Sequence, residues 1–285
     1  MSDFIGTKLT MNLGERSYDI ILKNGALENL YQFARLDRKV AVVTDSGVPA
    51  QYAQRVADQC RDAVIITVPQ GEASKSFKIL ETVLKQMLDF HMGRGDLVVA
   101  VGGGVVGDLA GFAASIYMRG IDFINCPTTT LSMIDSSIGG KTAVDLGDTK
   151  NIVGAFWQPK LVIVDPDTLA TLPRRHYING LAEAVKASLL ADPELFAIFE
   201  KGDIDGQINE IIYRSLRFKK NIVEQDETEH GMRKALNFGH TIGHGIEAVK
   251  GIKGRRTVGL FHGECVALGM LPMIESKALQ KRGGG

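Results

Sequence analysis

The segment Leu97–Met118 constrains the fold most, because it is the most apolar long window of the sequence and yet is rich in glycine. This glycine density and Asp108 fit a buried strand, a turn and a helix better than a membrane span. We predict the strand over Leu97–Val101, the turn over 102–108 and the helix up to about Met118. Such a turn presents backbone N–H groups and a helix N-terminus to an anion. It does not match the Gly-x-Gly-x-x-Gly dinucleotide fingerprint, so a purely structural turn is the alternative.

Short apolar runs alternate with helical patterns up to about Leu172. Further strands are expected at Tyr18–Leu22, Lys39–Thr44, Val64–Val68, Asp122–Cys126 and Leu161–Val164, and helices at Val48–Gln59 and 76–90. Strands separated by helices favour a mainly parallel, Rossmann-like sheet covered on both faces. After Pro173 helical periodicity replaces the strands. The expected organisation is an α/β domain over 1–173 followed by an all-α domain over 174–285.

The composition argues against several classes of protein. The 33 Lys and Arg residues balance the 33 Asp and Glu residues, and a neutral chain lacks the basic surface that nucleic acids or anionic membranes attract. The start of the chain has no basic region followed by an apolar run, so we predict no signal peptide. Cys60, Cys126 and Cys265 have neither metal-binding nor redox spacing, which indicates reduced thiols in a cytoplasmic protein.

A glycine-rich segment of the helical part carries His240 and His244, which lie one helical turn apart on one face. Glycine is costly inside a helix, so its density here predicts that something approaches the backbone closely. His262 follows downstream, and Glu183 lies upstream in an apolar helical pattern. Two imidazoles and a carboxylate from separate helices are a common catalytic zinc arrangement. The alternative is that these are capping or buried core histidines, but their clustering favours a metal site.

The segment from Pro127 to Asn151 is long for a connection inside a compact domain, which usually means a functional segment. It combines hydroxyl side chains and paired glycines with Lys141 and Lys150, and Arg119 lies shortly before it. Close backbone approach and point charges are what a phosphate or another oxyanion needs. A solvated loop is the alternative, but apolar residues interleaved through the segment predict that it is packed down.

Asp45 follows one of the predicted strands directly. A carboxylate at the C-terminal end of such a strand can accept a hydrogen bond from a ribose hydroxyl, as in nucleotide-binding folds. It can equally be an ordinary N-cap of the next helix. A bound dinucleotide is therefore plausible from the pattern alone.

Several motifs, taken together and in this order, resemble the 3-dehydroquinate synthase family. They are Gly102–Phe112, Tyr117–Gly120, Asp135–Thr142, Lys150–Phe156, Leu181–Lys186 and Leu236–His244. The likeness runs from about residue 18 to residue 275. It implies an NAD-binding α/β domain followed by an all-α metal domain in a carbon–oxygen lyase of the shikimate pathway, the route to aromatic amino acids. The implied reaction converts 3-deoxy-D-arabino-heptulosonate 7-phosphate to 3-dehydroquinate with loss of phosphate.

The resemblance also implies roles for individual residues. Glu183, His240 and His262 would bind a divalent metal, zinc or cobalt, so that His244 becomes a polar neighbour. The residues implied to contact NAD are Asp45, Glu72, Lys75, Gly104, Val105, Asp108, Thr128, Thr129, Lys150, Thr168, Leu169 and Thr171. Those implied around the sugar-acid phosphate are Lys141 and Asn151 at the phosphate, Lys219, Arg233 and Asn237 at the carboxylate, and Asp135, Lys186 and His244 at the reacting hydroxyls. Arg119 would reach across from a second subunit, which implies a homodimer.

The implied chemistry explains this mixture of parts. Oxidation of an alcohol by NAD acidifies the neighbouring carbon so that phosphate can leave, and the hydride is then returned. Alternatives on the same scaffold are a related sugar-phosphate cyclase and a metal-dependent polyol dehydrogenase. Ser136 and Ser137 beside Gly139-Gly140-Lys141 favour dehydroquinate synthase over the cyclases. Because family members usually continue for several more helices, we also expect the helical part to be cut short, and a truncated, non-catalytic NAD-binding chain is a further alternative.

Overall fold

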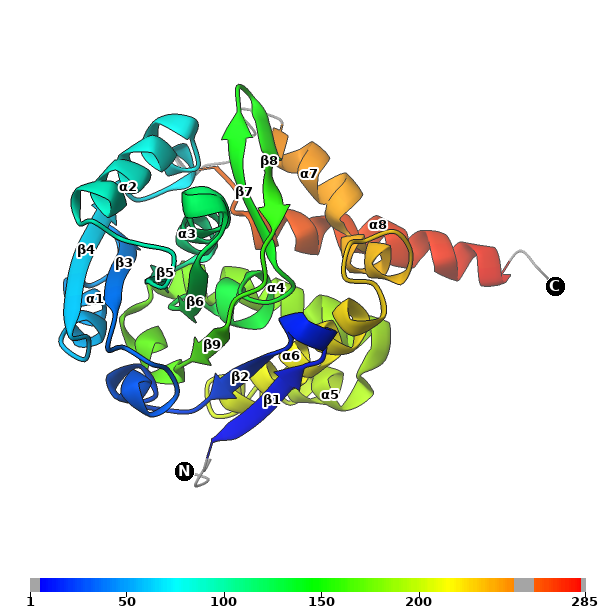
Figure 1. Cartoon of the computed structure of the whole chain (residues 1–285). Helices are drawn as coiled ribbons and strands as arrows, with labels where there is room; N and C mark the ends of the chain where they lie inside the picture. Colours follow the sequence, from blue (N-terminus) through cyan, green and yellow to red (C-terminus); the bar gives the residue numbers. More distant parts are fainter. Residues whose placement is uncertain (1–5, 249–258, 283–285) are drawn as a thin grey trace. The chain divides into compact units, whose positions relative to one another are not determined.

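The computed structural model describes residues 6–248 and 259–282 (Figure 1). The chain forms two compact units, Met1–Leu172 and Pro173–Gly285. Among the described residues, no helix is long and apolar enough to cross a membrane.

The first unit is built on a seven-stranded sheet in the order β1-β2-β9-β6-β5-β3-β4. Its strands are β1 (Thr7–Met11), β2 (Tyr18–Leu22), β3 (Lys39–Asp45), β4 (Asp62–Val68), β5 (Leu97–Gly102), β6 (Asp122–Pro127) and β9 (Leu161–Val164). All neighbouring pairs are parallel except β1 with β2. The predicted α/β class with a mainly parallel sheet is thereby confirmed.

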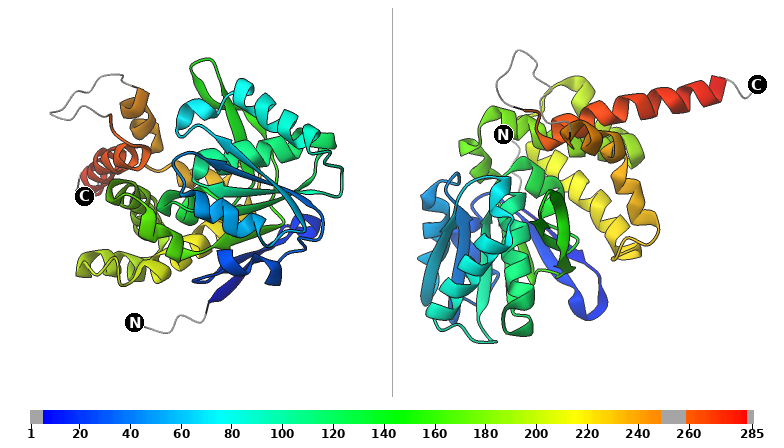
Figure 2. Two further views of the ribbon diagram at one scale, coloured as in Figure 1. Left: turned by 90° about the vertical axis from the view of Figure 1, so that its left-hand side faces the viewer. Right: turned by 90° about the horizontal axis from the view of Figure 1, so that it is seen from above.

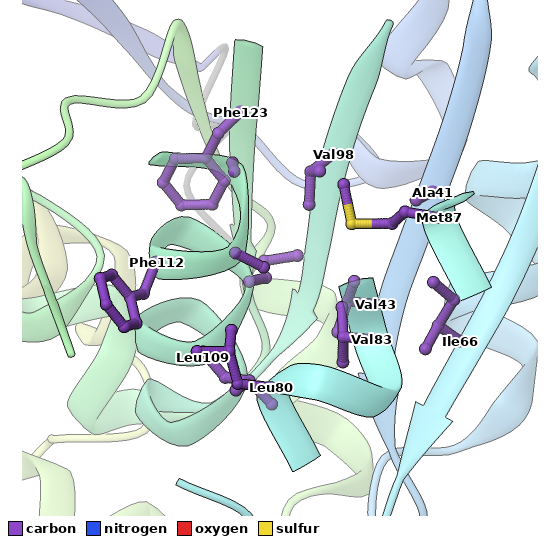
Figure 3. Packing of buried hydrophobic residues seen from close by; sticks show 14 of the residues in the cluster. Ala41, Val43, Ile66, Leu80, Val83, Met87, Val98, Leu109, Phe112 and Phe123 are labelled. Carbon is purple, nitrogen blue, oxygen red and sulfur yellow. The ribbon is translucent and has the colours of Figure 1, made fainter. Parts of the chain in front are cut away.

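Helices cover both faces of this sheet (Figure 2). The helices are α1 (Ala50–Ala57), α2 (Phe77–Asp89), α3 (Gly104–Ile116) and the 3₁₀ segment η2 (Leu27–Gln32). On one face Leu80, Val83 and Met87 of α2 pack with Ile66 and Val98 of the sheet (Figure 3). On the other face α1 and η2 cover alternate residues of the same strands. Because successive strand residues point to opposite faces, strands buried on both sides are apolar throughout, which is why they were predictable.

The segment 127–151 is not a single loop, and that prediction was wrong in part. It contains a π-helical turn, η5 (Ser132–Ser136), and the hairpin of β7 (Lys141–Leu146) and β8 (Thr149–Phe156), which forms its own two-stranded sheet. The expected packing-down is confirmed, since Ile134 is 2% exposed and Val144 is fully buried. The hairpin was missed because much of β8 is exposed, so no apolar alternation marks it.

The described part of the second unit consists of helices and turns. The helices are α4 (Arg174–Ala191), α5 (Pro193–Lys201), α6 (Ile208–Gln225), α7 (His240–Ala248) and α8 (His262–Arg282), with the 3₁₀ segment η7 (Met232–Asn237) before α7. Arg214 ties α5 to α6 through Asp192 and Glu194, with N–O distances of 3.1 and 2.5 Å. Helix α8 packs against both α4 and α7, and these three helices carry the candidate metal ligands.

Candidate functional site

The carboxyl edge of the parallel sheet gathers most of the residues expected to contact NAD. Asp45 ends β3, the turn after β5 leads into α3, and Thr128 and Thr129 follow β6. Glu72 and Lys75 come after β4. Thr168, Leu169 and Thr171 follow β9, in the 3₁₀ segment η6 (Pro166–Thr171), and Lys150 lies in the hairpin strand β8 (Thr149–Phe156). Ligands of open α/β sheets bind outside the carboxyl ends of the strands, where the strand order reverses. That reversal lies between β3 and β5, beside Asp45 and the glycine-rich turn.

The glycine-rich turn is packed tightly. Gly103 is the N-cap residue of α3. An added Cβ would lie 3.1 Å from Thr129 Cγ2 at Gly103, and 3.0 Å from Ser136 Oγ at Gly104. The structural explanation for these glycines is therefore correct in part, and anion binding at the N-terminus of α3 stays a prediction. Asp45 does not cap α1, whose N-cap is Pro49; its Oδ1 accepts a hydrogen bond from Gly47 N at 2.7 Å.

A buried lysine connects α3 to the hairpin. Lys75 is 4% exposed, and its Nζ donates to Asp108 Oδ2 at 2.6 Å and to Asn151 Oδ1. Asn151 has a left-handed backbone with φ of 55°, and its N–H donates to Asp145 Oδ1 at 2.8 Å. Asp145 N in turn donates to the Lys75 carbonyl at 2.8 Å. The structure thus links two residues expected at NAD, Lys75 and Asp108, to one expected at the substrate phosphate, Asn151.

The other predicted residues of the first unit fall into two groups. Thr168 and Leu169 are buried, and Thr171 Oγ1 hydrogen-bonds Tyr52 Oη at 2.9 Å. Exposed or partly exposed residues are Glu72, Val105, Arg119, Asp135, Lys141 and Lys150. Arg119 lies in the 3₁₀ segment η4 (Tyr117–Arg119) with φ of 68°. Arg119 is exposed, and its expected role at a partner subunit stays a prediction.

Glu183, His240 and His262 converge in the second unit. Glu183 projects from α4 and is 2% exposed, and its Oε1 lies 3.5 Å from His240 Nε2 and 3.9 Å from His262 Nε2. Two ligands of one tetrahedral zinc ion at ordinary bond lengths lie about 3.3 Å apart. The observed separations are long for hydrogen bonds and close to this value. Both separations from Glu183 are therefore near the size expected for two ligands of one metal ion.

The Nδ1 atoms of His240 and His262 each lie near an oxygen that can accept a hydrogen bond. His240 Nδ1 lies 3.4 Å from the Phe238 carbonyl oxygen, and His262 Nδ1 lies 3.3 Å from Glu247 Oε2. An Nδ1–H donated to these oxygens fixes the tautomer in which Nε2 has a lone pair for a metal. Glu247 was missed from the sequence, although it lies seven residues after His240 and therefore on the same face of α7.

His244 is also near this cluster. One ring nitrogen of each of His240, His244 and His262 can be chosen so that all lie within 4.8 Å of one another. The His244 ring centroid is 5.3 Å from that of His240 and 5.6 Å from that of His262, and the residue is exposed. This geometry keeps open both expectations for His244, as a ligand beside His240 and as a polar neighbour.

Buried cations also lie in the second unit, and one of them, Lys186, contacts Glu183. Lys186 is 3% exposed; its Nζ contacts Glu183 Oε2 and donates to the Leu236 carbonyl at 2.8 Å. Lys219 and Arg233 are 7% and 1% exposed, and Arg233 Nη1 donates to the Glu227 carbonyl. Asn237 is exposed, and its Nδ2 donates to Glu229 Oε1 at 3.2 Å.

The glycines around His240 allow two helices to cross closely. A Cβ at Gly243 would lie 3.0 Å from the Cys265 carbonyl oxygen, and one at Gly269 would lie 2.2 Å from the Gly239 carbonyl oxygen. Gly239 has φ of 80°, a conformation that L side chains rarely adopt. The close approach expected from the glycine density is therefore present, and the approaching element is α8.

Comparison with known proteins identifies the class of enzyme. Residues 65–179 match the family model for the N-terminal part of 3-dehydroquinate synthase, and residues 180–283 match the model for its C-terminal part. The chain is 43% identical to the 3-dehydroquinate synthase of Streptococcus thermophilus over 97% of this chain and 81% of that protein. The chain belongs to the 3-dehydroquinate synthase family.

Two solved structures of related synthases are similar in fold. A 2-deoxy-scyllo-inosose synthase complexed with carbaglucose-6-phosphate, NAD⁺ and Co²⁺ matches with a TM-score of 0.83 and 27% identity, over 93% of this chain and 75% of that one. A 2-epi-5-epi-valiolone synthase from Streptomyces hygroscopicus subsp. jinggangensis, with NAD⁺ and Zn²⁺ bound, matches with a TM-score of 0.78 and 29% identity, over 91% and 74%.

Proposed function

We propose that this chain converts 3-deoxy-D-arabino-heptulosonate 7-phosphate to 3-dehydroquinate and inorganic phosphate, as an NAD- and metal-dependent carbon–oxygen lyase. Family membership supports the reaction. The observation that carries the site is the convergence of His240 Nε2 and His262 Nε2 on Glu183 Oε1 at 3.5 and 3.9 Å. A divalent metal held there, zinc or cobalt, would act as a Lewis acid on a substrate hydroxyl.

NAD would be held by the residues at the carboxyl edge of the first unit, with its pyrophosphate at the N-terminus of α3 and Asp45 near a ribose. The cofactor would oxidise the substrate alcohol temporarily and would not be consumed, because the hydride is returned. The chain's own contribution is orientation. Lys75 holds Asp108 and Asn151 together, so that the NAD-binding turn and the hairpin keep one fixed arrangement.

The remaining polar residues would bind different groups of the substrate. Lys141 and Asn151 would bind the phosphate, because an ammonium and an amide offer a point charge and a donor to its oxygens. Lys219, Arg233 and Asn237 would bind the carboxylate. The side chains for the reacting hydroxyls would be Asp135, Lys186 and His244. A homodimer would place the partner's copy of Arg119 near the phosphate.

The test is an assay of phosphate release from the seven-carbon substrate, with absorbance of the reduced nicotinamide followed in the same cuvette. We expect phosphate to be released over many turnovers while no NADH accumulates. Accumulating NADH would identify a polyol dehydrogenase instead. Absence of phosphate release from a chain that binds NAD and zinc would identify a non-catalytic member of the family.

Substitution of Lys141 tests the phosphate site. Lys141→Ala should weaken binding of the substrate and of free phosphate together, by about 1.5–3 kcal/mol for one charge-assisted hydrogen bond. NAD affinity should change less. The matched control is Lys160→Ala, an exposed lysine directly before β9 and therefore at the opposite edge of the sheet. Equal losses of NAD and substrate affinity in Lys141→Ala would assign this lysine to the cofactor.

A further inference from the structure

Four residues hold the N-terminus of α8, where His262 is the first helical residue. We name Arg175 and Asn179 of α4, together with Phe261 and Glu264, the α4–α8 clamp. We propose that this clamp positions His262 for metal binding, so that Arg175, Asn179 and Glu264 are positioning residues. The inference rests on the metal site proposed above.

The start of α8 lacks a capping side chain of its own, because the preceding residue is Phe261 and phenylalanine has no acceptor. Asn179 of α4 supplies one: its Oδ1 accepts from Gly263 N at 2.8 Å and from Glu264 N at 3.2 Å. These are the second and third N–H groups of the helix, which an N-cap side chain normally satisfies. Glu264 Oε2 reaches back to accept from Phe261 N at 2.9 Å. The two halves of a capping box therefore come from two different helices.

Arg175 fixes the same segment from a second direction. Its Nε and Nη2 donate to Glu264 Oε1 and Oε2 at 2.8 and 2.7 Å, and Nη2 also donates to the Gly259 carbonyl at 2.9 Å. The guanidinium carbon of Arg175 lies 3.9 Å from the centroid of the Phe261 ring. The Phe261 ring also stacks on the His176 ring, with centroids 4.6 Å apart. A bidentate pair combined with a stacked guanidinium fixes orientation as well as distance.

The clamp relates His262 directly to another candidate ligand. Asn179 and Glu183 lie four residues apart on one face of α4, so the residue that caps α8 and the carboxylate that faces His262 share a rigid helix. The helices also touch next to His262, since a Cβ at Gly263 would lie 1.9 Å from the Asn179 carbonyl oxygen. Loss of the clamp would let the start of α8 move relative to Glu183. Displacement of a ligand by a few tenths of an ångström weakens metal binding, because metal–ligand distances have a narrow range.

The neighbouring arginine provides a matched control. Arg174 Nη1 lies 2.7 and 3.0 Å from the Asp205 carboxylate oxygens, and its guanidinium carbon lies 4.7 Å from the Tyr177 ring centroid. Arg174 thus makes the same kinds of interaction as Arg175, from the adjacent position of α4, but with residues outside the clamp. Lysine keeps the charge at either position, and at Arg175 it removes the two-nitrogen contact with Glu264.

The experiment measures zinc affinity by competition with a chelator, and the rise in melting temperature that zinc produces, for the wild type, Arg175→Lys, Asn179→Ala and Arg174→Lys. We expect the Kd for zinc to rise about 10- to 100-fold in the two clamp variants, as for other residues that support metal ligands. Their zinc-dependent rise in melting temperature should shrink, while NAD affinity and the Arg174→Lys values stay as in the wild type.

The outcomes separate this inference from the proposed function. Zinc affinity within two-fold of the wild type in both clamp variants would overturn the clamp and leave the metal site intact. Equal weakening in Arg174→Lys would also overturn it, because the effect would then be a general one on α4. If the wild type bound no zinc, the proposed metal site and the clamp would both be wrong. Should Arg175→Lys fail to fold, Glu264→Gln, which retains a side-chain acceptor, is measured in its place.

Discussion

Replacement of His240 by alanine is expected to remove bound metal and abolish turnover while the first unit still binds NAD. The loss of one of three protein ligands should raise the Kd for zinc by more than the roughly 100-fold that supporting residues cost. NAD affinity should persist because the residues proposed to hold NAD lie within Met1–Leu172. Chelation of the wild type should have the same effect on turnover, and Zn²⁺ or Co²⁺ should restore it.

The control for this variant is His230→Ala, which removes an exposed histidine of the same unit. The backbone N–H of His230, which the substitution retains, donates to Asp226 Oδ1 at 2.9 Å. Metal content should be unchanged in the control. Unchanged metal content in His240→Ala, Glu183→Ala and His262→Ala alike would disprove the ligand assignment. His244→Ala decides its open role: lost zinc affinity would make it a ligand, and lost turnover with zinc retained would make it a polar neighbour.

Lys75→Met is expected to destabilise the first unit and to weaken NAD and substrate binding together. The lysine is 4% exposed and the partner Asp108 is 21% exposed, so the pair is largely withdrawn from water. Removal of one partner of a buried pair costs 3–5 kcal/mol, and the partial exposure of Asp108 places our expectation at about 3 kcal/mol. Urea unfolding measures this change as a lower midpoint with an unchanged slope.

Two further variants make the Lys75 test specific. The double substitution Lys75→Met with Asp108→Asn should recover part of the stability, because the remaining carboxylate charge is neutralised. Lys85→Met removes a lysine whose contact with Glu81 is also short, at 2.7 Å, but whose pair is 68% and 63% exposed, and it should leave the unfolding midpoint nearly unchanged. Equal destabilisation by Lys85→Met and Lys75→Met would contradict the explanation by burial.

The central strands were predictable because they are apolar on both faces. Runs such as 39–45 and 97–102 have this pattern and were placed within a residue or two. Strand β1 and the hairpin were missed, since β1 lies at the sheet edge and β8 is largely exposed. Their pairing depends on contacts with β2 and with α3 that sequence periodicity does not encode.

The candidate metal site was predictable in kind but not in detail. The spacing of His240 and His244 alone predicts that they lie close together, because residues four apart are neighbours on any helix. The approach of His262 to Glu183 depends instead on how α8 crosses α4, and that crossing rests on Gly263 and Asn179, 84 residues apart. The contact of Arg175 with Glu264 follows from the same crossing, and the contact of Glu247 with His262 follows from how α8 crosses α7.

The hairpin β7–β8 is a two-stranded sheet of its own, separate from the seven strands behind it. It carries Lys141, Lys150 and Asn151, while the other proposed NAD contacts lie at the carboxyl ends of the main strands and in the segments that follow them. Under the proposed function, substitutions at exposed positions of the hairpin should change phosphate binding, whereas Val144 packs in the same core cluster as the main sheet. Exchange of this one hairpin between related synthases is a route by which a single scaffold could diversify its substrates, with the redox cofactor retained.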